Sequence, residues 1–346
     1  MSHRQLLSRI AVAALGVSAV LAAAATPPGG TAYRMIARYP IGGNDTGYDY
    51  LRVDAPTRRV FVAHATRVEV LNADTGQKVG EIAGIQGAHG IEIVESLNKG
   101  YITGGLDRAV TVFDRNTLKV LHVIKGLGVK PDAIQYDAET HRLFVVNGGA
   151  TGDVTLIDPS NDSIVGTVNL QGSKLEQIGF DGHGHAFVND ESKNVIHVFD
   201  THSLKPTATW TLGGCEEPTG MAVDREHSRV FAACGNEKLA VLDTNDGHVV
   251  AVPAIGSDPD GAVFNPRTQQ IFTSNREGTL SVLHEVSPDR YETLQTLKTE
   301  PGARTLALDE KTDRIFMPTA RMGATPAGGG RAPIVPETFV LLAAGH

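Results

Sequence analysis

Seven side chains capable of chemistry recur at intervals of about forty residues. They are four carboxylates, an imidazole, a guanidinium and a hydroxyl, contributed by Asp49, His89, Asp132, Glu176, Thr219, Asp260 and Arg304. If the fold brings them together, the carboxylates raise one another's pKa unless a cation lies among them. Such a group could bind a polar ligand, hold a metal ion or supply a general base.

A second series of positions follows the first at an interval of fourteen or fifteen residues. It contains His64, Gly104, Asn147, Asp190, Cys234, Asn275 and Thr319. Each member lies at the end of a predicted strand, so we expect the two series to meet on one face of the protein. The predicted ligand-binding residues are therefore Asp49, His64, His89, Asp132, Glu176, Asp190, Asp260 and Arg304.

Three interpretations of these side chains are open. They could bind only water and satisfy backbone groups, or they could bind an organic ligand oriented by Arg304 and the acids. Alternatively, Asp49, His64 and His89 could offer oxygen and nitrogen ligands to a divalent metal ion. The common hydrolase, phosphate-loop and zinc-protease motifs are absent, so the sequence identifies no catalytic residue.

The positions belong to a unit of 41 to 44 residues that repeats along the chain. Its clearest mark is a turn residue, found at Asp54, Glu95, Asp137, Asp181, Asp224, Asn265 and Asp309. Each turn precedes an apolar run such as HRLFVVN, then an alternating segment such as DVTLID and a last one such as IVGTVNL. Four short strands per repeat are typical of a propeller blade, so we predict an all-β, seven-bladed β-propeller.

The ends of the chain are expected to close this ring. We place the blades at about 47–86, 87–129, 130–174, 175–216, 217–257, 258–301 and 302–346. The last blade lacks a fourth strand, whereas residues 33–43 form a fourth-type strand with no unit before it. We predict that this N-terminal strand pairs with 338–343, which leaves no free edge. We call the end of the central channel where the first series lies the mouth.

Three segments of the repeat resemble the YVTN repeat of YncE-like seven-bladed propellers. They are KPDAIQYDAETHRLFVVNGGATGDVTLIDPSND, EPTGMAVDREHSRVFAACGNEKLAVLDTNDG and DPDGAVFNPRTQQIFTSNREGTLSVL. FVVN and IFTSN come closest to the tetrapeptide, while FVAH, YITG, FVND, FAAC and FMPT depart from it. The resemblance implies a protein that binds a small ligand or a partner protein at the mouth. Lactonases also occur on similar propellers, so the alternative is a lactonase-like or metal-dependent hydrolase.

Residues 1–25 have the layout of a secretory signal peptide, with Arg4 and Arg9 before an apolar run at 10–21 and small residues at 22–25. The run is shorter than the ~20 residues needed to span a bilayer, although an uncleaved anchor is the alternative. We expect 26–346 to be periplasmic or secreted. This segment has 29 Lys and Arg against 39 Asp and Glu, a net charge of −10, and no basic cluster, which disfavours a nucleic-acid partner.

Two cysteines, Cys215 and Cys234, complete the set of predicted features. In an oxidising compartment they are expected to form a disulfide, and two buried thiols or a metal pair are the alternatives. Four histidines lie in turns on the face opposite the mouth, where we expect solvated side chains and not ligands: His141, His183, His185 and His227. The connection at 320–337 is unusually long and is either a Gly-rich loop or a lid over the mouth.

Overall fold

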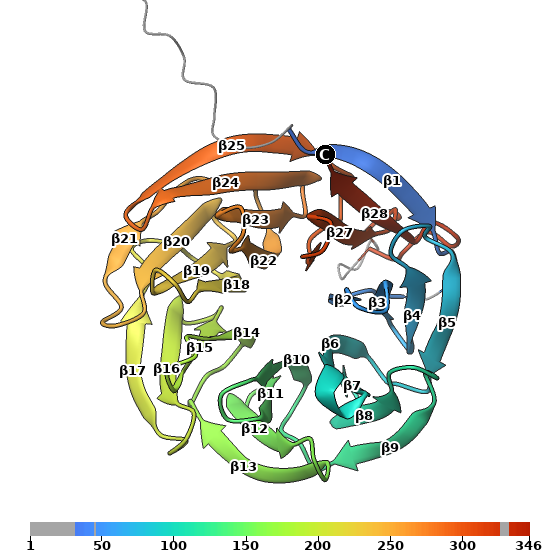
Figure 1. Ribbon diagram of the computed structural model, residues 1–346, viewed down its shortest axis with the longest axis horizontal. Helices are drawn as coiled ribbons and strands as arrows, with labels where there is room; N and C mark the ends of the chain where they lie inside the picture. Colours follow the sequence, from blue (N-terminus) through green and yellow to red (C-terminus); the bar gives the residue numbers. More distant parts are fainter. Residues whose placement is uncertain (1–31, 45, 326–331) are drawn as a thin grey trace, which may run out of the picture.

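The computed structural model describes residues 32–44, 46–325 and 332–346. These residues form seven four-stranded antiparallel sheets arranged as blades around a central channel (Figure 1). The predicted fold class, an all-β seven-bladed β-propeller, is confirmed. The predicted signal peptide at 1–25 lies outside the described residues. Within the described ranges, no helix is long and apolar enough to cross a bilayer.

Each blade runs from an inner strand at the channel to an outer strand at the rim. Blades 1 to 3 contain β2 (Leu51–Asp54), β3 (Arg59–His64), β4 (Arg67–Asn72), β5 (Lys78–Ala83); β6 (Ala88–Val94), β7 (Lys99–Gly104), β8 (Ala109–Asp114), β9 (Val120–Lys125); and β10 (Pro131–Asp137), β11 (Arg142–Asn147), β12 (Asp153–Asp158), β13 (Ser163–Asn169). Blades 4 and 5 contain β14 (Leu175–Phe180), β15 (His185–Asp190), β16 (Val195–Asp200), β17 (Pro206–Thr211); and β18 (Pro218–Asp224), β19 (Arg229–Cys234), β20 (Lys238–Asp243), β21 (Val249–Ala251). Blades 6 and 7 contain β22 (Pro259–Asn265), β23 (Gln270–Asn275), β24 (Thr279–Ser287), β25 (Arg290–Lys298); and β26 (Ala307–Asp309), β27 (Arg314–Thr319), β28 (Val340–Gly345), β1 (Arg34–Pro40). A 3₁₀ turn, η1 (Glu95–Leu97), follows β6.

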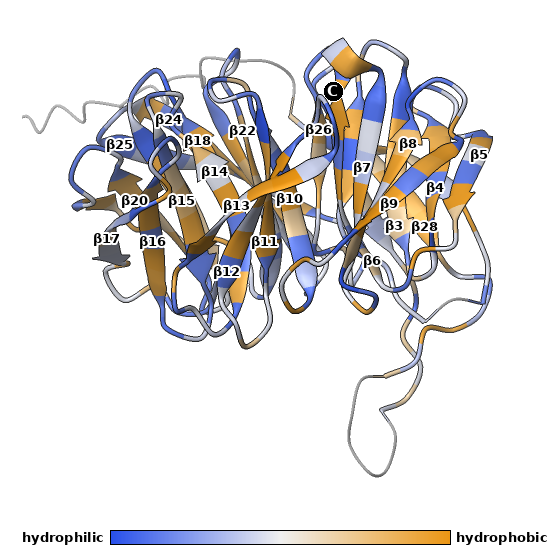
Figure 2. Ribbon diagram, turned by 90° about the horizontal axis from the view of Figure 1, so that it is seen from below, coloured by the Kyte–Doolittle hydropathy of each residue, from blue (hydrophilic) through white to orange (hydrophobic). Residues whose placement is uncertain are grey.

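The core lies between adjacent blades and is built from the apolar runs of the repeat. The second strand of each blade carries one fully buried aromatic ring at an equivalent position: Phe61, Tyr101, Phe144, Phe187, Phe231, Phe272 and Phe316. Figure 2 shows hydrophobic residues along the strands and hydrophilic ones at the turns of both faces. Burial of these rings between blades explains why the repeat keeps an aromatic residue here.

The turn residues of the repeat have a structural role. The Asp137 carboxylate accepts hydrogen bonds from the backbone N–H of Thr140 at 3.1 Å and from its hydroxyl at 2.7 Å. Asp309 accepts the Thr312 hydroxyl in the same way, at 2.6 Å. Both carboxylates are buried, and a buried acceptor without a hydrogen bond destabilises the fold, so these bonds stabilise the turns.

The N-terminal strand closes the ring, as the sequence predicts. β1 pairs antiparallel with β28, with Arg34 opposite Gly345 and Pro40 opposite Val340, and it lies at the rim of blade 7 (Figure 1). Tyr33, which directly precedes β1, is buried and packs edge to face on Phe272 at 5.1 Å between ring centroids. The first segment of the described chain therefore joins blade 7 and contacts blade 6.

Candidate functional site

The mouth contains a cavity of about 280 Å³ that all seven residues of the first series line. These residues come from the loops and strand starts of seven different blades, and the ring closure brings Asp49 of blade 1 beside Arg304 of blade 7. The first series therefore converges on one cavity, as the sequence predicts.

His89 lies between two carboxylates on the floor of the mouth. Its Nδ1 atom is 2.5 Å from Asp49 Oδ2 and 3.8 Å from Asp132 Oδ1. Burial opposes the charged imidazolium, but the hydrogen bond to Asp49 and the charge of Asp132 raise the pKa of His89. When Nδ1 carries a proton, it donates this hydrogen bond to Asp49 Oδ2.

Arg304 connects the two ends of the ring. Its guanidinium forms an ion pair with Asp260 and lies 3.5 Å from Asp49 Oδ1, and it also donates to the Tyr48 carbonyl at 3.2 Å. Only 9% of Arg304 is exposed. We therefore expect substitution of Arg304 to lower the stability of the fold, because two carboxylates of the mouth pair with this cation.

Glu176 completes the acidic side of the mouth. Burial and the neighbouring Asp132 carboxylate raise the pKa of Glu176 well above its usual range. Lys130, 3.0 Å from Asp132, and Lys174, 4.0 Å from Glu176, supply cations on this side. The mouth thus combines hydrogen-bond donors and acceptors of both charges in one cavity.

The structure places His64 and Asp190 outside this cavity, which corrects the prediction that the second series reaches the mouth. His64 is fully buried, and its Nδ1 atom lies 3.4 Å from Glu69 Oε1. Its ring packs on that of Phe339, with 4.1 Å between the ring centroids. Asp190 is also fully buried and bonds to His197 Nε2 at 3.1 Å. Both side chains therefore form contacts inside the blades.

The strand register explains this difference. Asn147 lies opposite Pro131 and Asp190 opposite Leu175, the residues that come just before Asp132 and Glu176. Opposite residues of an antiparallel pair share a face, and successive residues of a strand point to opposite faces. The second-series side chains therefore point away from the face that the first series uses.

Sequence analysis missed six further charged residues that line the mouth: Lys130, Lys174, Glu191, Glu217, Asp258 and Arg276. Four of them precede a first-series residue by two positions, and Glu191 and Arg276 directly follow the second strand of their blade. The repeat could have indicated them, because the same offsets recur in several blades.

A second, more apolar cavity of about 620 Å³ adjoins the mouth. Arg276 and Arg304 line both cavities, and the apolar side is formed by Tyr48, Met322 and Ile334. The two arms of the long connection pair here, with Gly323 N–H bonded to the Pro333 carbonyl at 2.7 Å. Residues 326–331 lie outside the described range, so the lid interpretation stays a prediction.

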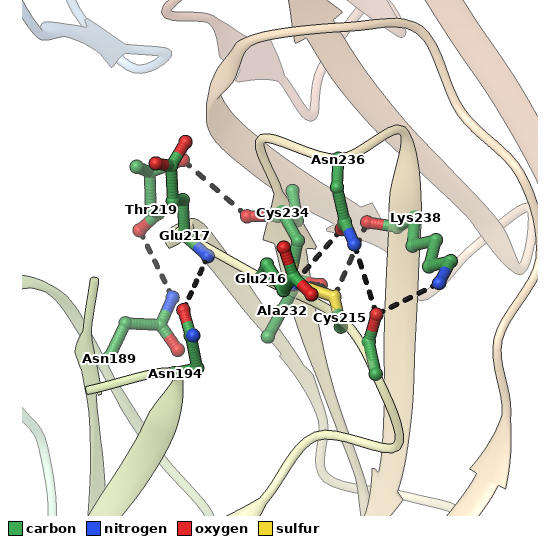
Figure 3. The surroundings of a disulfide bond; sticks show 12 residues. Asn189, Asn194, Cys215, Glu216, Glu217, Thr219, Ala232, Cys234, Asn236 and Lys238 are labelled. Atoms are coloured by element: carbon green, nitrogen blue, oxygen red, sulfur yellow. Dashed lines mark hydrogen bonds between the residues drawn. A yellow bond between two sulfur atoms is a disulfide. The ribbon is translucent and has the colours of Figure 1, made fainter. Parts of the chain in front are cut away.

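Cys215 and Cys234 form a disulfide with a Cα–Cα distance of 5.7 Å beside the mouth. Figure 3 shows it next to the segment that carries Glu217 and Thr219. The Glu217 backbone N–H donates to Asn194 Oδ1 at 2.8 Å, and the Asn189 side-chain amide donates to the Thr219 carbonyl at 3.1 Å. The disulfide therefore fixes the loop that enters blade 5 at the mouth.

Replacing both cysteines with serine is expected to lower the free energy of unfolding by roughly 3 kcal/mol, because the loop that they close regains entropy in the unfolded chain. Urea unfolding curves of the double variant and the parent measure the difference. Reduction of the parent should reproduce it, and identical curves would contradict a stabilising role.

The mouth also contains a group of possible metal ligands. Ligand atoms of Asp49, His89 and Asp132 all lie within 4.8 Å of one another. The predicted set of Asp49, His64 and His89 is not brought together; among the described residues Asp132 takes the place of His64. The donor set of one nitrogen and two oxygens suits a divalent ion, although Arg304 and Lys130 already neutralise the two carboxylates.

Two curated proteins are similar in sequence to this chain. Proteins named "Uncharacterized protein YncE" from Salmonella typhimurium and Salmonella typhi are each 24% identical to the chain over 215 residues. The chain is thus similar in sequence to YncE proteins, and it folds as a seven-bladed β-propeller. The similarity covers 61% of this chain and 49% of each relative, so the chain spans about half the length of the curated relatives that it matches. No family model matches the chain.

Solved structures share the propeller fold of this chain at much lower sequence identity. Hydrazine synthase of Kuenenia stuttgartiensis has a TM-score of 0.69 at 14% identity, covering 80% of this chain and 94% of that one. The WD40 repeats of RRP9 have a TM-score of 0.77 at 10% identity, covering 91% and 99%. At such identities the likeness establishes the propeller alone.

Proposed function

We propose that this YncE-like propeller is a periplasmic or secreted binding protein that takes a small organic ligand at its channel mouth. The observation that supports it is the junction of the charged mouth with the apolar cavity at Arg276 and Arg304. One ligand can place polar groups among the mouth side chains and an apolar part against Tyr48 and Ile334. Apolar walls with a few convergent polar groups are the usual form of such sites.

The extracytoplasmic location rests on two features of the chain. The layout of residues 1–25 is that of a secretory signal peptide. The Cys215–Cys234 disulfide is of the kind that persists in oxidising compartments. Together they favour the periplasm or the extracellular medium over the cytoplasm.

A metal-dependent, lactonase-like hydrolase is the second candidate, favoured by the Asp49, His89 and Asp132 group. A divalent ion bound there would activate water and polarise a carbonyl group. The ligand-binding proposal stands first because Arg304 and Lys130 already pair with Asp49 and Asp132, so a metal ion would have to displace these cations. Elemental analysis of purified protein separates the two, since a stoichiometric metal at the mouth that His89→Ala removes favours the hydrolase.

The binding proposal is tested by screening a fragment library against the purified protein by ligand-observed NMR. We expect His89→Ala to abolish the binding of mouth fragments, because it removes the donor held between Asp49 and Asp132. Asp137→Ala is the matched control: it removes turn hydrogen bonds and costs roughly 1–3 kcal/mol of stability, yet leaves fragment binding intact. Fragments that bind parent and His89→Ala equally would contradict the proposed site.

A further inference from the structure

A second group of ligating side chains lies at the junction of blades 5 and 6, on the face opposite the mouth. His227 Nδ1 is 2.7 Å from Asp224 Oδ2 and 3.4 Å from Glu285 Oε1. Ligand atoms of all three residues lie within 4.8 Å of one another. Asp224 and Glu285 are buried, while the His227 side chain is 31% exposed. The imidazole is thus the most exposed member of the group.

The junction of blades 1 and 2 shows one way in which the repeat neutralises a turn acid. Glu285 in blade 6 is equivalent to Arg115 in blade 2. The Glu285 N–H donates to the Gln269 carbonyl at 2.8 Å, and the Arg115 N–H donates to the Asn98 carbonyl at 3.0 Å. Gln269 and Asn98 both have a left-handed backbone and directly precede the second strand of their blades. Arg115 reaches back to the turn acid of blade 1, Asp54, with two hydrogen bonds of 2.6 and 2.7 Å.

At the junction of blades 5 and 6 the same positions hold two acids. The turn acid Asp224 faces Glu285 in place of an arginine, and the two carboxyl groups lie within hydrogen-bonding reach of each other. Among the described residues, no lysine or arginine forms an ion pair with either of them; their charged partner is His227. Where blade 2 places an arginine, blade 6 therefore places an acid.

A buried acceptor also lacks a partner in this group. Glu285 Oε2 is buried without a hydrogen bond, and the Glu285 side chain has no exposed surface. The Asp224 carboxylate lies beside it, and two carboxylates placed together in a buried site repel each other. An unsatisfied carboxylate oxygen in a buried site costs free energy unless a cation or proton approaches it.

We propose that Asp224, His227 and Glu285 bind a divalent transition-metal ion of the zinc type, which takes the place of the arginine found between blades 1 and 2. One imidazole nitrogen and two carboxylate oxygens are typical zinc ligands, and ligand atoms around a tetrahedral zinc ion lie about 3.4 Å apart. Magnesium and calcium prefer all-oxygen sites, which the imidazole disfavours. The ion joins β18 with β24 and stabilises the contact of two blades.

The test uses the purified full-length protein after treatment with a chelator, titrated with zinc chloride by calorimetry and followed by thermal melting. We expect one zinc ion to bind at this junction and to raise the melting temperature. Glu285→Gln and His227→Ala should each lower the affinity by more than the roughly 10–100-fold that follows the loss of an outer hydrogen-bond partner of a ligand. His89→Ala, which removes the mouth imidazole, should keep the zinc-dependent shift.

Glu285→Arg provides a matched control that rebuilds the ion pair of blades 1 and 2. This variant is expected to melt above the metal-free parent and to show no response to zinc at this site. A parent protein whose melting temperature is unchanged by zinc overturns the proposal. The proposal is also overturned if Glu285→Gln and His227→Ala bind zinc as tightly as the parent, because the ion would then bind elsewhere. A shared proton would in that case join the two carboxyl groups.

Discussion

Deletion of residues 26–43 is expected to abolish the stable monomer, the largest effect that we predict. The deletion removes β1 and exposes the backbone edge of β28, with which β1 pairs from Arg34 to Pro40. It also removes the buried Tyr33, which packs on Phe272. Loss of a buried aromatic side chain alone costs about 3–5 kcal/mol, and the open edge adds a template for association.

Size-exclusion chromatography and thermal melting measure this effect. Deletion of residues 26–31 is the matched control, because it ends before Tyr33 and leaves β1 in place; we expect it to elute and melt like the protein that begins at residue 26. If the variant without 26–43 is monomeric and melts like this control, closure of the ring does not depend on β1.

The fold could be predicted because each blade repeats the same physical solution. The turn acids recur at 41 to 44 residues, and the aromatic residue of the second strand recurs with them. A blade cannot bury its faces alone, so the number of repeats determined the number of blades. The missing fourth strand of blade 7 and the unassigned strand at 33–43 then predicted the closure between β1 and β28.

The site was predicted less completely, since it depends on side-chain direction and on contacts across the ring. All seven first-series residues line the mouth because their equivalent positions share one orientation. His64 and Asp190 do not, because the register of β3 and β15 turns them into the blades. The sequence also treated His227 as a solvated turn residue: its partner Glu285 lies 58 positions away in the next blade, a pairing that periodicity alone does not reveal.

Substitution of Arg304 is expected to produce the second-largest effect, on both stability and binding. Arg304→Met removes the guanidinium that pairs with Asp260 and Asp49 and leaves two buried carboxylates without it. Removal of one partner from a buried ion pair typically costs about 3–5 kcal/mol. Urea unfolding measured at pH 7 should show a loss of this order, and the fragments that bind the parent mouth should no longer bind.

The dependence of this loss on pH distinguishes its electrostatic cause from simple loss of packing. Burial raises the pKa of Asp49, but the Arg304 guanidinium, together with His89, holds it below its usual value, so loss of the guanidinium raises this pKa. In the parent, the lowered pKa of Asp49 contributes stability that is present above the unfolded pKa and is lost as the pH falls through the folded pKa, and the variant loses part of this contribution. Arg304→Met should therefore differ least from the parent in acid and most near neutral pH.

Two further variants separate stability from recognition. Arg304→Lys keeps the charge but not the planar fork that reaches two carboxylates, so we expect partial recovery of stability. Adding Asp260→Asn to Arg304→Met removes one unpaired charge and should also restore part of it. Neither variant regains the guanidinium shared by the two cavities, so fragment binding should stay weak in both; a double variant that binds like the parent would show that Arg304 serves the fold alone.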